Sequence, residues 1–126
     1  MDTLGLLWGV VVVSARTSEA AGGKLLLQRV RQQLSRWDVV WVDGGYEHRL
    51  ELWAAEQCGL RVEVVKRSDQ HGGWELLPKR WVSERTFAWL GRWRALNREY
   101  DYWPATTEFN IHLAMFHLML RRLTVR

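Results

Sequence analysis

Three short apolar runs in the first half of the chain have the length and composition of β-strands. The first occupies residues 6–13 and is rich in valine, and the second occupies residues 38–42 and is followed by Asp43. Continuous apolar runs of this kind are typical of strands that are covered on both faces. The third run, residues 60–65, alternates apolar and charged positions, which predicts a strand with one wetter face.

Apolar residues at helical spacing lie between and after these runs. They predict helices over residues 20–36, 47–57 and 79–97, and a last helix from Thr106 or Thr107 to Leu123. Thr17 or Ser18 is expected to cap the first helix, and Gly59 to end the second. The order β-α-β-α-β-α-α indicates an α/β domain with a small mixed sheet flanked by helices, and 126 residues suit a single domain.

The charge of the chain is concentrated in one segment. The net charge is +4, and residues 79–98 hold six basic side chains against one acid, Glu84. A basic stripe of this kind is the electrostatic footprint of a protein that binds a polyanion. The apolar runs are too short to span a bilayer, and the single cysteine, Cys58, excludes an internal disulfide. We therefore expect a cytoplasmic protein with no membrane partner.

Two acids are candidates for chemistry. Asp43 follows the second strand, and ligands in open α/β sheets gather at the carboxyl ends of strands. Glu84 stands alone among basic residues. Each has a plainer explanation, because Asp-Gly is common in turns and Glu84 can pair with Arg80 one helical turn earlier. Brought together over a basic, aromatic surface, they would suggest a divalent metal held against a nucleic-acid backbone.

Four separated segments resemble the insertion-sequence transposases that use an Asp-Asp-Glu triad: residues 2–7, 43–46, 80–90 and 118–123. The spacing of Arg80 and Glu84 matches that family's signature around its last catalytic acid. The resemblance implies an RNase H-like core that cleaves DNA and transfers the strand. It also implies two Mg²⁺ ions, with Mn²⁺ as the alternative, bound by three carboxylates. Asp43 and Glu84 would be the second and third catalytic and metal-binding acids.

The resemblance also implies partners and a binding surface. DNA, as transposon ends and target, would be the main partner, and a second copy or a full-length transposase would be another. Phosphate contacts are expected from the basic side chains of the last third of the chain, unless these form only a solvated helix face: Lys79, Arg80, Arg85, Arg92 and Arg94. The tryptophans at positions 81, 89 and 93 are expected in the core rather than as base-stacking platforms.

The first catalytic aspartate of the family normally lies on an earlier strand. Residues 1–126 are therefore expected to be part of a catalytic domain that lacks its first strand and is weakly active or inactive alone. Asp2 lies nearby, but it matches the start of the family's second strand and is not expected to replace the missing ligand. Two other functions stay open, a non-catalytic DNA-binding remnant and an RNase H-like nuclease that acts on another nucleic acid.

Overall fold

The computed structural model describes residues 1–44, 46, 48–65, 80–98 and 101–125. The chain forms two compact units. One, the strand unit, comprises Val13–Trp81, and the other, the helical unit, combines Met1–Val12 with Val82–Arg126.

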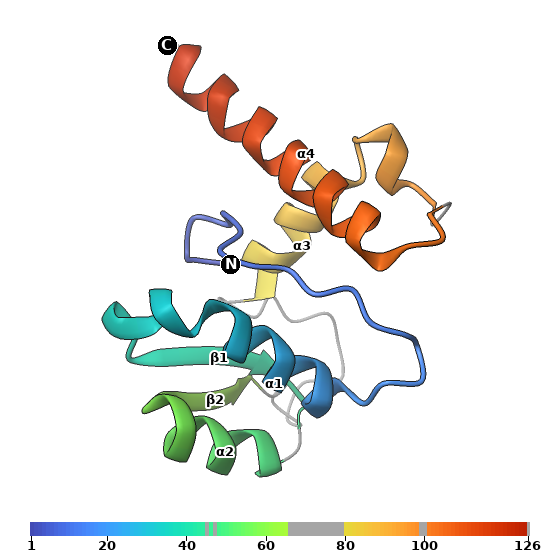
Figure 1. Ribbon diagram of the computed structural model, residues 1–126. Coiled ribbons are helices and arrows are strands. Elements are labelled where there is room, and N and C mark those ends of the chain that lie inside the picture. Colours follow the sequence, from blue (N-terminus) through green and yellow to red (C-terminus); the bar gives the residue numbers. More distant parts are fainter. Residues whose placement is uncertain (45, 47, 66–79, 99–100, 126) are drawn as a thin grey trace, which may run out of the picture. The chain divides into compact units, whose positions relative to one another are not determined.

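The strand unit alternates helices with two strands in the order α1 (Glu19–Val30), the 3₁₀ helix η1 (Arg31–Arg36), β1 (Val39–Asp43), α2 (His48–Cys58) and β2 (Arg61–Val65). The strands are parallel, and the register runs from Val39 opposite Arg61 to Asp43 opposite Val65. Parallel neighbours need a crossover connection, and α2 supplies it (Figure 1). The predicted α/β class is confirmed in this unit.

Local sequence signals set the ends of the two helices. The Ser18 hydroxyl accepts a hydrogen bond from the Ala21 N–H at 3.2 Å, which confirms Ser18 as the cap of α1. The first helix ends earlier than predicted, because the chain tightens into η1 after Val30. Gly59 follows α2 with φ of +65°, a left-handed conformation that glycine adopts without strain.

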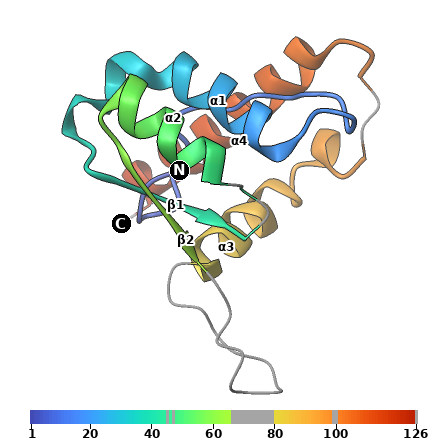
Figure 2. The same cartoon turned by 90° about the horizontal axis from the view of Figure 1, so that it is seen from below.

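The core of the strand unit lies between the two helices and one face of the sheet. Its buried members are Leu27 and Val30 from α1, Leu50 and Ala54 from α2, and Leu60. Valines 40 and 62 pack against this cluster from neighbouring strands, so that α1 and α2 share a face of the sheet (Figure 2). The predicted inward positions of α2 are confirmed by the full burial of Leu50 and Ala54.

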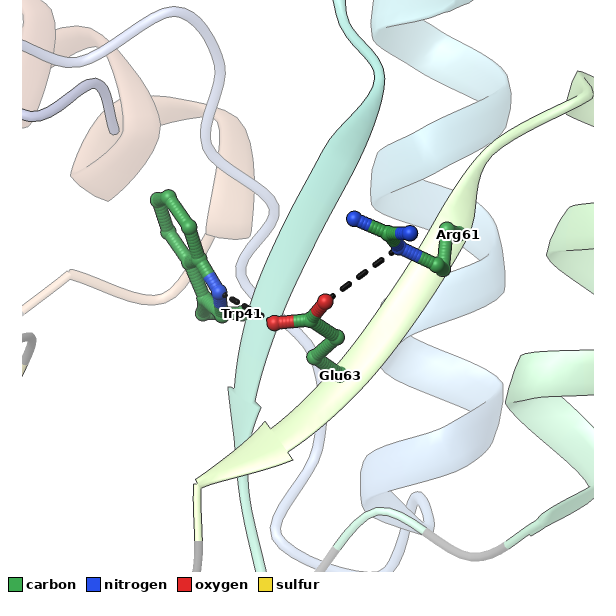
Figure 3. Close-up of polar contacts among 3 residues, drawn as sticks. All are labelled: Trp41, Arg61 and Glu63. Atoms are coloured by element: carbon green, nitrogen blue, oxygen red, sulfur yellow. Dashed lines mark hydrogen bonds and ion pairs between the residues drawn. The ribbon is translucent and has the colours of Figure 1, made fainter.

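The opposite face of the sheet is polar, because side chains alternate along a strand. Trp41 stands opposite Glu63 in the register, and its indole Nε1 donates to Glu63 Oε2 at 2.8 Å (Figure 3). Arg61 Nε lies 3.2 Å from Glu63 Oε1 (Figure 3). The wetter face predicted for the third run is therefore present.

The helical unit contains α3 (Arg80–Leu90), the short 3₁₀ helix η2 (Arg94–Leu96) and α4 (Pro104–Thr124), together with the N-terminal segment. The first two residues of α3 are counted with the strand unit. α3 is shorter than predicted, because turns at Gly91 to Trp93 replace its helical hydrogen bonds. α4 begins earlier than predicted, at Pro104, because the fixed φ of proline suits the first position of a helix.

The prediction of a strand over residues 6–13 is wrong, because this segment has no regular secondary structure. A strand needs a neighbour to satisfy its backbone groups, and the described part of the chain places none beside it. The Val12 N–H donates instead to Glu108 Oε1 at 2.9 Å. The sheet in the described residues consequently has two parallel strands and no antiparallel one. No helix among those residues is long and apolar enough to cross a membrane.

Candidate catalytic acids and basic surface

Asp43 ends β1 opposite the last residue of β2, so it stands at the carboxyl end of the parallel pair. Its side chain is 66% exposed. Oδ1 accepts a hydrogen bond from the Gly44 N–H at 2.7 Å, and the Asp43 carbonyl accepts one from the Tyr46 N–H at 3.2 Å. The residue thus shapes the turn after the strand and also presents a carboxylate to solvent.

Arg80 is the predicted basic residue that the structure places beside a predicted acid. Its Nη2 lies 4.0 Å from Asp43 Oδ2, and its side chain is 42% exposed. Solvent screens such a pair, so it adds little to stability. It does put a cation at the carboxyl end of β1.

The pKa of Tyr46, three residues after Asp43, is affected by charges near the same end of the sheet. Burial raises the pKa of the Tyr46 phenol above its ordinary value of 10.0, and the negative charges of Glu19 and Asp43 raise it further. The neutral phenol is therefore favoured in the folded protein.

Glu84 is exposed on α3, four residues after Arg80. Residues at this spacing share one face of a helix. Glu84 belongs to the helical unit, whereas Asp43 belongs to the strand unit. Their approach to a common metal stays a prediction. In the described ranges no three side chains of the His, Cys, Asp or Glu type are grouped so that they could hold a metal ion.

A buried hydroxyl attaches the Glu84 helix to the N-terminal segment. Thr86 is fully buried, and its Oγ1 donates to the Gly5 carbonyl at 2.8 Å. Gly5 has φ of +81°, and a Cβ at this position would lie 2.6 Å from Thr86 Oγ1. The neighbouring Arg85 Nη2 donates to the Leu4 carbonyl at 2.9 Å. Only glycine permits this close approach, so the turn at Gly5 positions α3 within the helical unit.

Asp2 holds that turn together. Its Oδ1 accepts hydrogen bonds from the backbone N–H groups of Leu4 at 2.9 Å and Leu6 at 3.0 Å. Its Oδ2 accepts one from Trp8 Nε1 at 3.3 Å. These bonds give Asp2 a structural role. This turn could have been predicted from the sequence, because an aspartate followed closely by a glycine is typical of turns.

Trp89 links α3 to α4. The guanidinium carbons of Arg85 and Arg122 lie 4.7 Å and 4.4 Å from the centre of its ring. Trp93 contacts His117 of α4, with ring centres 5.7 Å apart. Trp89 and Trp93 are half-buried in this packing, so the core position expected for them is confirmed only in part. The core position predicted for Trp81 is wrong, because that side chain is 39% exposed.

The predicted phosphate-binding residues therefore have different surroundings. Arg92 and Arg94 follow α3 and are exposed, as is Arg80. Arg85 is half-buried and is engaged with Leu4 and Trp89. Lys79 lies outside the described residues.

Comparison with known proteins identifies the family. Residues 1–119 match the family described as "Transposase DDE domain". The chain is also 37% identical over 68 residues to a Burkholderia cepacia protein whose name describes it as a candidate transposase for insertion sequence element IS402. That match covers 54% of this chain and 32% of the relative, so the chain spans about a third of the relative's length. No solved structure matches the chain. Since the family match covers nearly the whole sequence, the chain belongs to the DDE transposase family.

Proposed function

We propose that this chain carries part of the catalytic domain of an insertion-sequence transposase, which cleaves DNA and joins the freed strand to a target. The observation that carries the proposal is the exposed carboxylate of Asp43 at the carboxyl end of a parallel strand pair. This is the edge at which α/β sheets place ligands. The crossover from β1 through α2 to β2 also supports an RNase H-like arrangement.

Asp43 and Glu84 would hold divalent metal in this proposal. Both are exposed, and their carboxylate oxygens are the hard donors that Mg²⁺ prefers, with Mn²⁺ as the alternative. When bound, such ions align the attacking and leaving oxygens of a phosphodiester. Arg80, which approaches Asp43, would contact a phosphate of the DNA in this proposal.

The two acids named in this chain are fewer than the three on which the family's chemistry depends. We therefore expect weak cleavage, or none, from residues 1–126 alone. The exposed arginines at positions 92 and 94 favour DNA binding even where cleavage is lost. This is the second candidate function, a non-catalytic DNA-binding protein. A nicking assay on supercoiled DNA with Mg²⁺ separates the two, because only a catalytic chain produces a metal-dependent nick.

Metal binding tests the assignment of the acids without requiring activity. Titration of the full chain with Mn²⁺, followed by electron paramagnetic resonance, measures the affinity directly. Asp43→Asn and Glu84→Gln should each weaken Mn²⁺ binding by about tenfold or more, because each removes a ligand. Asp38→Asn and Glu56→Gln are matched controls, since both acids are exposed and lie outside the proposed site. Equal Mn²⁺ affinity in Asp43→Asn and wild type would overturn the assignment.

A further inference from the structure

The indole of Trp89 contacts two guanidinium groups, one from its own helix and one from α4. The guanidinium carbon of Arg85 lies 4.7 Å from the ring centre, and that of Arg122 lies 4.4 Å from it. All three residues belong to the helical unit, so the arrangement does not involve the strand unit. A guanidinium within about 6 Å of an indole centre is attracted to the negative face of the ring. The contact therefore restrains both arginine side chains.

The two arginines differ in the donors that they keep for a ligand. Arg85 is half-buried, and its Nη2 donates to the Leu4 carbonyl at 2.9 Å. Arg122 is exposed in the last turn of α4, and no carboxylate among the described residues forms an ion pair with it. An aromatic ring is only a weak acceptor, so the contact with Trp89 leaves most of the five N–H donors of Arg122 available for a charged acceptor.

An exposed guanidinium that is already restrained suits a phosphate. Its planar fork of N–H groups matches two phosphate oxygens, and charge-assisted hydrogen bonds of this kind are stronger than neutral ones. An arginine that moves freely loses rotamer entropy when it binds, whereas one held against a ring has lost part of it already. The second positive charge at the same ring, on Arg85, adds to the attraction for an anion.

We propose that Arg122, restrained by Trp89, contacts a phosphate of the DNA and so positions the strand beside Glu84. The inference rests on the proposed function, because it takes the DNA of that proposal as the ligand. Trp89 follows Glu84 by five residues of α3, a rise of about 7.5 Å. Phosphates of one strand follow one another at about 3.4 Å along the duplex axis. The contact therefore falls on a phosphate that flanks the reacting one.

Fluorescence anisotropy of the full chain with a labelled DNA duplex, over a series of salt concentrations, tests the contact. Arg122→Ala should weaken binding by about tenfold and lower the slope of log affinity against log salt by about 1. Arg121→Ala is the matched control, because Arg121 is also exposed in the last turn of α4 and lies about 100° away around the helix. It makes the same charge change and should keep the slope of the wild type.

The outcomes separate this inference from the proposed function. Equal losses of affinity and slope in Arg122→Ala and Arg121→Ala would overturn the inference and leave DNA binding by the chain intact. A wild type that does not bind DNA would overturn the proposed function, and the inference with it.

A conservative variant separates a phosphate contact from a role confined to packing. Arg122→Lys keeps the positive charge but loses the planar fork, so the salt slope should stay near that of the wild type while the affinity falls several-fold. Circular dichroism measures the Tm of each variant and checks that it is folded. A lower Tm with unchanged DNA affinity, in both Arg122→Lys and Arg122→Ala, would show that Arg122 only joins α4 to Trp89 and would overturn the inference.

A double-mutant cycle tests the part that Trp89 plays. Trp89→Leu removes the ring without changing the charge, so it should weaken DNA binding. In that background Arg122→Ala should cost less affinity than in the wild type, because the arginine is no longer restrained. An equal cost in the two backgrounds would overturn the role of Trp89. If Trp89→Leu does not fold, the comparison of Arg122→Lys, Arg122→Ala and Arg121→Ala decides the inference.

Discussion

Arg80 Nη2 lies 4.0 Å from Asp43 Oδ2, so the first residue of α3 approaches the last residue of β1. Both side chains are partly exposed, and the pair is worth at most about 1 kcal/mol. The pair matters because it places a positive charge beside Asp43. Arg80 occupies the helical turn before Glu84, so the cation beside one proposed acid is a helical neighbour of the other.

The first prediction is that Asp43 and Glu84 come close together in the active protein. Two carboxylates that share an ion must each place an oxygen about 2 Å from it. In a Cys58→Ser background, Asp43→Cys combined with Glu84→Cys should react efficiently with a short thiol cross-linker. Asp43→Cys combined with Glu56→Cys should react poorly, because Glu56 is exposed near the end of α2, which leads back to the opposite end of the sheet. Equal yields from the two pairs would count against a shared site.

The second prediction concerns DNA binding. Arg92→Ala combined with Arg94→Ala should weaken binding and reduce the slope of log affinity against log salt by about 1 for each phosphate that is no longer neutralised. Fluorescence anisotropy with a labelled duplex over a salt series measures both quantities. Arg31→Ala combined with Arg36→Ala makes the same charge change at two exposed arginines of η1 and should leave the slope unchanged. A slope that falls equally in the two variants would indicate only a general charge effect.

The third prediction concerns the turn that holds α3. Gly5→Ala should lower the free energy of unfolding by about 2–4 kcal/mol, because its Cβ would meet Thr86 Oγ1 in a backbone conformation that alanine avoids. Thr86→Val should cost about 1–3 kcal/mol, because the Gly5 carbonyl loses its donor. Urea unfolding followed by tryptophan fluorescence measures both. In the control Gly22→Ala, the added Cβ meets only Val13 Cγ2 at 3.8 Å, and stability should be unchanged or slightly higher.

The fourth prediction is a pH effect at Tyr46, whose pKa burial raises above 10.0, with further contributions from Glu19 and Asp43. Because the folded-state pKa is the higher one, the stability from the neutral phenol is fully present below pH 10 and is lost as the pH rises through the raised pKa. The ultraviolet difference titration between wild type and Tyr46→Phe isolates this ionisation. Asp43→Asn should move it toward 10.0, and a titration unaffected by Asp43→Asn would exclude that electrostatic interaction.

Features that depend on neighbouring residues were predicted well from the sequence. Helical hydrogen bonds and caps join residues close in the chain, so Ser18, Gly59 and the inward face of α2 could be identified directly. The strand that ends at Asp43 was predicted from its apolar run and the Asp-Gly pair that follows, because both are patterns of adjacent residues. The family was also predicted, since its motifs are short and separated along the chain.

Tertiary structure decided the features that depend on distant partners. Residues 6–13 have the composition of a strand, but a strand exists only beside another, and Val12 donates instead to Glu108. Only the tertiary structure shows that the Arg85 guanidinium contacts the Leu4 carbonyl and the Trp89 ring, and its predicted phosphate contact stays a prediction. Apolar periodicity predicted the last helix without showing which of its two apolar faces is buried. Packing buried Ala114 and Met115 and left Phe109 and Phe116 exposed, because burial is decided by the surface that a helix meets.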